Sequence, residues 1–154
     1  MSAEAGESFI NVSKFSQFSS ILNANDYEHS WEKMKVGHQQ KIEIKTLDGC
    51  FDEGLLPGNR RFLLKMDTQG YDLEVFNGAA RSLPELCCML SELSLVPVYH
   101  GMPHYLESLR AYESQGLSAS GLYPITTHAD LALNEVDCML VNTRTLKRVR
   151  SENG

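Results

Sequence analysis

The feature that most constrains the fold is the segment 62–79, FLLKMDTQGYDLEVFNGA, in which a short apolar run leads into a helical pattern. The run ends at an acid, Asp67, and a polar turn containing a glycine follows directly. After the turn, Leu73 and Phe76 recur at helical spacing. A short run that is apolar on both sides is typical of a parallel strand in a covered sheet. We therefore predict a buried strand that feeds a helix, with Asp67 and Gln69 at the edge where such sheets bind ligands.

A second apolar run, residues 86–95 (LCCMLSELSL), predicts the neighbouring strand. The two runs are separated by about twenty residues, which is enough for a right-handed crossover through a helix, so the strands should be parallel. Glu92 lies near the carboxyl end of the second run, as Asp67 does at the end of the first. Because neighbouring strands lie about 4.8 Å apart, the two carboxyl groups should meet at one edge of the sheet.

The remaining segments predict a mixed α/β fold. Residues 41–47 alternate apolar and polar side chains, which indicates a half-exposed strand pairing antiparallel with residues 8–13. Between them, residues 15–40 show no sustained period and are predicted to be a long loop with one helical turn. A short helical turn is expected around Asp48, followed by a break at residues 57–59. A surface helix is expected over 103–116 and an antiparallel hairpin from 119–123 and 135–141. Together these elements predict a three-layer sheet.

Composition sets the class of protein and its partners. The chain has 154 residues, which fits one domain, and a net charge of −6. Nucleic acid is not expected as a partner, since phosphate binding needs a basic face. No run reaches the roughly 20 apolar residues of a membrane span, and the first residues lack a secretory signal, so we predict a cytoplasmic protein with no membrane partner. We expect residues 1–7 to be disordered, residues 8–143 to form the domain, and residues 144–154 to be a basic, flexible tail.

The cysteines and histidines do not predict a metal site. The four cysteines include no C-x-x-C pair and are expected to be reduced thiols that are buried or half-buried. His100 and His104 are four residues apart, but Gly101 and Pro103 lie between them, so they do not share one helix face.

Two segments carry a family resemblance. KMDTQGYDLEVFNGA and ELSLVPVYHGMP, in this order and spacing, resemble segments of the FkbM-type S-adenosylmethionine-dependent methyltransferases. The similarity extends more weakly to residues 18–22, to 44–48 and to the closing hairpin. Asp72 stands where the family usually has Glu. No Gly-rich strand-to-helix turn occurs before residue 58, so we expect the chain to correspond to the C-terminal half of the family's Rossmann-like methyltransferase sheet.

The resemblance implies methyl transfer from S-adenosylmethionine to a hydroxyl of a small molecule or sugar. Asp67 and Glu92 are the candidate catalytic residues, which can orient the hydroxyl, remove its proton or face the sulfonium of the cofactor. The alternative is that each is a solvated acid or is held by a backbone N–H group. Lys65 and Gln69 are candidate substrate contacts. Their structural alternatives, which the residues favour, are a lysine that extends from the strand and a glutamine that forms the turn.

A second hypothesis belongs to a different class of function. The missing Gly-rich half also fits a truncated, non-catalytic domain that acts as an interaction module. A sheet opened at a central strand would expose an unpaired, apolar edge, which favours association with another chain. We therefore also expect self-association through the open sheet edge.

Overall fold

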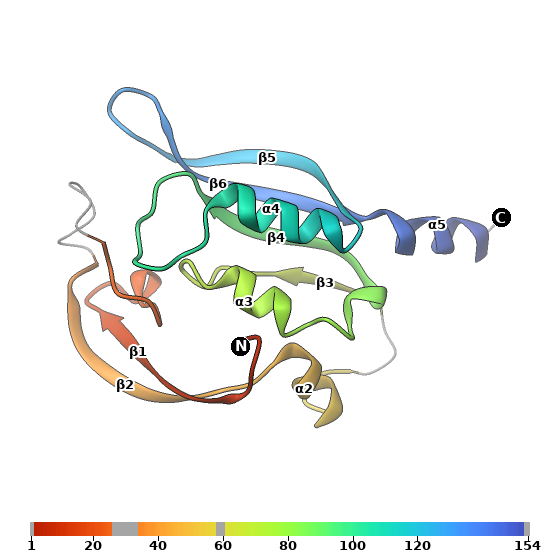
Figure 1. The fold of residues 1–154 in the computed structure, drawn as a ribbon, viewed down its shortest axis with the longest axis horizontal. Helices are drawn as coiled ribbons and strands as arrows, with labels where there is room; N and C mark the ends of the chain where they lie inside the picture. The colour runs from red at the N-terminus through yellow and green to blue at the C-terminus, as the bar shows by residue number, and fades with distance from the viewer. Residues whose placement is uncertain (1, 26–33, 58–60, 153–154) are drawn as a thin grey trace.

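The computed structural model describes residues 2–25, 34–57 and 61–152 (Figure 1). Its main sheet has the strand order β3-β4-β6-β5. Strands β3 (Phe62–Lys65) and β4 (Leu86–Ser94) are parallel neighbours, as predicted. Strand β6 (Leu133–Asn142) pairs antiparallel with β4 and with β5 (Leu117–Thr127), which confirms the C-terminal hairpin and makes both of its strands longer than expected.

A separate two-stranded sheet precedes the main one. Strand β1 (Gly6–Ser13) pairs antiparallel with β2 (Val36–Ile44), which confirms the predicted pairing. The bounds of the second strand differ from the predicted 41–47, because β2 begins inside the segment predicted to be a loop and ends at Ile44. The predicted long loop between them contains a 3-10 turn, η1 (Ser16–Phe18), and its residues 26–33 lie outside the described part of the chain. The other helices are α2 (Leu47–Asp52), α3 (Asp72–Asn77), η2 (Leu83–Glu85), α4 (Tyr105–Ser114) and α5 (Thr143–Glu152). The predicted break at 57–59 falls largely outside the described residues.

Helices α3 and α4 cover the same face of the main sheet (Figure 1). The rings of Phe76 on α3 and Tyr112 on α4 meet edge to face, with centroids 4.7 Å apart. Tyr112 and Ser91 of β4 share a hydrogen bond of 3.0 Å, so alternate residues of β4 point at both helices. The buried apolar side chains beneath the helices form the main core, which includes Leu64, Met66, Val75, Phe76, Leu86, Met89, Leu93, Cys138 and Leu140.

The opposite face of the sheet differs from the predicted three-layer arrangement. Leu63, whose register partner is Cys88, is 58% exposed, and Leu90 is only half-buried. In the described part of the chain, no helix covers this face. The apolar run of β3 therefore reflects one buried side and one open side, where the sequence pattern indicated two covered sides.

Asp72 has a role that the helical pattern did not predict. Leu73 and Phe76 mark the apolar side of this helix in the sequence, and Asp72 falls outside that spacing, on the side expected to be polar, yet its side chain is buried. Its Oδ1 accepts hydrogen bonds from the backbone N and the hydroxyl of Thr68, at 2.9 and 2.5 Å. Its Oδ2 accepts from the Ser91 hydroxyl at 2.9 Å and from the Glu92 backbone N at 3.1 Å. This carboxylate therefore joins the turn after β3 to strand β4.

The described residues at both chain ends contact the rest of the fold. The backbone N of Ser2 donates to the carbonyl of Lys45 at 3.1 Å, and Ser2 is buried. At the other end, Asn142 Oδ1 accepts from the backbone N of Arg144 and of Thr145, both at 3.1 Å, which caps α5. The Thr145 hydroxyl donates to the Pro84 carbonyl at 3.0 Å. The first turn of α5 is therefore fixed to η2.

Replacing Asp72 by Ala should destabilise the fold by about 3 kcal/mol, because it leaves buried donors without an acceptor. Urea unfolding measures this loss. Asn77→Ala is the matched control, since Asn77 is an exposed side chain on the same helix and should change the stability by less than about 0.5 kcal/mol. Equal effects of the two substitutions would contradict the role assigned to the carboxylate.

Candidate functional site

The turn after β3 has a backbone that only certain residues tolerate. Gln69 has a φ of 50° and Gly70 a φ of 85°, both in the left-handed region. A Cβ at Gly70 would lie 3.2 Å from the Cβ of Met102 and 3.3 Å from side-chain carbons of Leu22 and Tyr99. Glycine is therefore needed at position 70 both for the conformation and for the close approach of two other segments.

Gln69 connects three parts of the chain. Its backbone carbonyl accepts from the Ser20 hydroxyl at 2.8 Å, and its side-chain Oε1 accepts from the Tyr99 hydroxyl at 2.8 Å. Its Nε2 donates to Asp67 Oδ1 at 3.3 Å. These bonds support the structural alternative for Gln69, and they also place its amide directly beside the candidate catalytic acid.

Asp67 lies at the end of β3, on the open face of the sheet. Its side chain is 51% exposed. Besides the Gln69 contact, its Oδ2 accepts from the ammonium group of Lys65 at 3.3 Å. Lys65 is 58% exposed, so this ion pair contributes less than about 1 kcal/mol to stability. Lys65 thus extends from the strand and neutralises Asp67 at the same time.

Glu92 lies on β4 in a different environment. It is half-buried and is the register partner of Asp137 on β6. Burial and then the negative charges of Glu135, Asp67 and Asp72 together raise the pKa of Glu92 to about 8. At neutral pH this group is therefore mostly a protonated acid. Asp67 follows Lys65 by two residues and Glu92 follows its register partner Leu90 by two, so the two predicted acids lie at matching positions along neighbouring strands.

Glu135 completes this group, and sequence reasoning missed it. Its charge contributes to the raised pKa of the Glu92 side chain, and its Oε2 accepts from the Thr126 hydroxyl at 2.8 Å. Burial raises the pKa of the Tyr99 hydroxyl, and the charges of Glu135 and Glu92 raise it in the same direction. The alternation of charged and apolar residues in β6 was visible in the sequence, but the pairing of β6 with β4 was not. We call Asp67, Glu92 and Glu135 the acidic edge.

His100 and His104, which the sequence did not predict to bind a metal, lie in different surroundings. His104 Nδ1 accepts from the backbone N of Leu106 at 3.3 Å and caps α4, while His100 is exposed. Across residues 2–25, 34–57 and 61–152, no group of three or more His, Cys, Asp or Glu side chains is arranged to hold a metal ion. Within the same residues, no helix has the length and apolar character needed to cross a membrane.

Comparison with known proteins finds one family. A family model described as "Methyltransferase FkbM domain" matches residues 3–117, a range that runs from the N-terminal hairpin through α4. No curated protein and no solved structure matches the chain. The family match confirms the resemblance drawn from the two segments around Asp67 and Glu92.

The raised pKa of Glu92 predicts a pH-dependent effect of Glu92→Gln. The folded-state pKa of Glu92, about 8, lies above the usual 4.5, so between these pH values the folded protein holds a proton that the unfolded chain has lost. The free energy of unfolding therefore falls as the pH rises from about 4.5 through about 8. Relative to wild type, the variant should gain on the order of 2 kcal/mol at about pH 9 and little at about pH 5. The full conversion of the shift from 4.5 to about 8, at about 1.4 kcal/mol for each pKa unit, would give a larger gain. The expected gain is smaller because Glu92 is partly exposed.

Urea unfolding at several pH values measures the stability difference between Glu92→Gln and wild type. The variant Glu135→Gln tests the cause, since removal of its charge should lower the pKa of Glu92 and shift the change to lower pH. A stability difference that stays constant across the pH range would contradict the assignment.

Proposed function

Because the chain belongs to the FkbM methyltransferase domain family, we propose that it acts in methyl transfer from S-adenosylmethionine to a hydroxyl group of a small molecule or sugar. One observation supports this proposal: β3 and β4 are parallel neighbours in which Lys65 pairs with Leu90, and Asp67 and Glu92 each follow two residues later, toward the carboxyl ends of the strands. In α/β sheets this edge is where ligands bind. The parallel pair, with α3 in the crossover between its strands, also supports a Rossmann-like sheet.

The two acids have different roles in this proposal. Asp67 is the exposed carboxylate, so it accepts the hydrogen bond and then the proton of an acceptor hydroxyl. Glu92 is mostly protonated at neutral pH, so it donates a hydrogen bond to the acceptor oxygen. Gln69 holds Asp67 in place through its amide, and Lys65 lies beside the same carboxylate. Removal of the proton makes the oxygen a better nucleophile for the methyl group.

The described residues fit only part of the cofactor. Carboxylates suit the positively charged ammonium and sulfonium groups of S-adenosylmethionine. Asp67, however, lies on an open face and lines neither the ≈ 270 Å³ cavity beside η2 nor the ≈ 380 Å³ cavity beside α3. These residues do not by themselves form an enclosed site for the adenosine, so the roles proposed above concern the acceptor hydroxyl alone.

The substitution Asp67→Asn tests the catalytic role. It should lower turnover by about a hundredfold or more, because the amide cannot take the proton. Stability should change by less than about 0.5 kcal/mol, since the side chain is exposed. The measurement is formation of S-adenosylhomocysteine by the full chain with a panel of sugars and small alcohols, and Glu113→Gln, an exposed change on α4, is the control.

Unchanged turnover in Asp67→Asn would remove Asp67 from the mechanism. Calorimetric titration of the chain with S-adenosylmethionine addresses the cofactor separately. The absence of heat at millimolar cofactor would leave the second candidate function below.

The second candidate is an interaction module, and a specific feature of the sheet favours it. Strand β3 is the outermost strand in the order β3-β4-β6-β5, so one of its edges has no strand partner within the described residues. Leu63 on the same strand is 58% exposed. An unpaired edge beside an exposed apolar side chain favours pairing with another chain, and we propose self-association through β3.

The variant Leu63→Lys tests this association. Wild-type protein should form dimers in a concentration-dependent way, and a lysine on β3 should keep the chain monomeric, because charged residues protect strand edges. Sedimentation velocity across a concentration series measures both. Leu122→Lys on β5 is the matched control, since Leu122 is equally exposed at 58% but lies on the other outer strand. A monomeric wild type, or equal effects of both variants, would contradict pairing through β3.

A further inference from the structure

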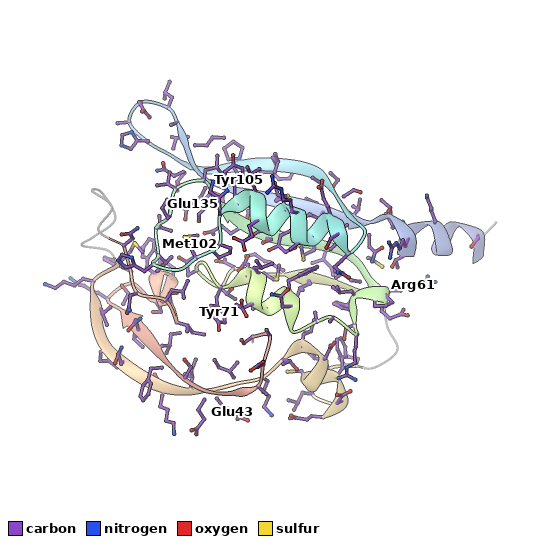
Figure 2. The ribbon with its side chains drawn as sticks, viewed as in Figure 1. Glu43, Arg61, Tyr71, Met102, Tyr105 and Glu135 are labelled. Carbon is purple, nitrogen blue, oxygen red and sulfur yellow. The ribbon has the colours of Figure 1, made fainter. Side chains whose placement is uncertain are left out.

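A cavity outside the acidic edge lies on the helix side of the molecule. It has a volume of ≈ 380 Å³ and is lined by the start of α3, by the loop before α4 and by Leu22 from the N-terminal segment. In Figure 2, Tyr71 and Met102, which both line it, are labelled on this side of the molecule. We call this cavity the helix-side groove. Its volume falls in the range of small-molecule sites, about 300–1,000 Å³.

The lining of the helix-side groove combines an apolar surface with negative charge. Leu22, Leu73, Met102 and Pro103 supply apolar contacts, and Glu74 on α3 and Glu107 on α4 supply two carboxylates. Neither carboxylate has an ion pair or hydrogen bond within the described residues, and none of the described lining residues is basic. The groove therefore attracts a cation and repels an anion.

The shape of the groove is fixed by contacts that are already part of the fold. Gly70 packs between Leu22, Tyr99 and Met102, and the Met102 sulfur accepts from the Tyr99 backbone N at 3.4 Å. A site whose walls are held in this way needs little ordering when a ligand binds. A narrow crevice of ≈ 10 Å³ shares Gly70, Leu73, Met102 and Pro103 with the groove and reaches Glu92. The crevice has room for about one water molecule, so the groove itself is the ligand-sized space.

We propose that the helix-side groove binds a small organic amine in its protonated form. The ammonium group lies toward Glu74 and Glu107, and the apolar body of the amine contacts Leu73, Met102 and Pro103. Two carboxylates on an apolar surface favour this class of ligand over a neutral alcohol, which gains no charge interaction, and over a carboxylate, which is repelled. The proposal does not depend on methyl transfer, because binding alone is claimed.

The probe is phenethylamine, titrated into the full chain with ¹³C-labelled methionine methyl groups. The Met102 methyl signal should shift and saturate. Met139 lies on the open face of the sheet as the register partner of Leu90, so its signal reports non-specific binding to apolar surface and should not move. Phenethyl alcohol and 3-phenylpropionate, which keep the aromatic body and change the charge, should bind at least about tenfold more weakly.

The variant carrying Glu74→Gln and Glu107→Gln should weaken phenethylamine binding by about tenfold or more, and Glu113→Gln on α4 should not. An unchanged methionine spectrum of the free variants confirms that the fold is intact. The proposal is overturned if Met102 shows no saturable shift at millimolar amine. It is also overturned if the neutral alcohol binds as well as the amine, if Met139 responds equally, or if the double variant binds like wild type.

Discussion

The buried carboxylate of Asp72 is the interaction on which the rest of the site depends. It accepts from Thr68 in the turn and from the backbone N of Glu92 on β4, so it sets the distance between the ends of two strands. Through Ser91, which also bonds the Tyr112 hydroxyl, the same contact reaches α4. A carboxylate that accepts several hydrogen bonds in a low-dielectric interior is costly to disturb. The turn that carries Asp67 and Gln69 is therefore positioned by a buried residue.

A second buried acid repeats this arrangement at the other end of β3. Asp48 on α2 accepts from the backbone N of Arg81 at 2.9 Å and from the backbone N and hydroxyl of Ser82 at 3.0 and 2.5 Å. Arg81 in turn makes a bidentate pair with Asp52, at 3.3 and 2.6 Å, so α2 is attached to the segment that follows α3. Asp72 and Asp48 thus both fix the segment between β3 and β4 by accepting hydrogen bonds from backbone N–H groups. Asp residues near helix starts therefore serve structure here, whereas the acids on the strands remain available for chemistry.

The sequence predicted most elements whose signal is local. The apolar lengths of 62–66 and 86–95 and the crossover between them were sufficient to predict parallel neighbours, in which Asp67 and Glu92 follow the paired residues Lys65 and Leu90. The errors arose where tertiary contacts decide. Helical spacing placed Asp72 on the polar side, because periodicity does not show that a first-turn carboxylate bends back to bind Thr68. Glu135 was missed because the register of β6 on β4 is set by packing across the whole sheet. The prediction of a third layer was wrong because an apolar run does not show whether both faces of a strand are covered. The face that carries Leu63 is open.

The different environments of two like residues decide what the acidic edge can do. Asp67 is exposed beside an ammonium group, whereas Glu92 is half-buried among other acids, and burial keeps Glu92 mostly protonated at neutral pH. The edge therefore offers a hydroxyl one acceptor and one donor, where two ionised carboxylates would offer acceptors only. Part of this difference comes from Glu135, which lies on β6 beyond residues 3–117. The acid–base character of the edge is thus set partly by a strand outside the residues that the family model matches. The hairpin of β5 and β6 consequently contributes to the acidic edge as well as to the sheet.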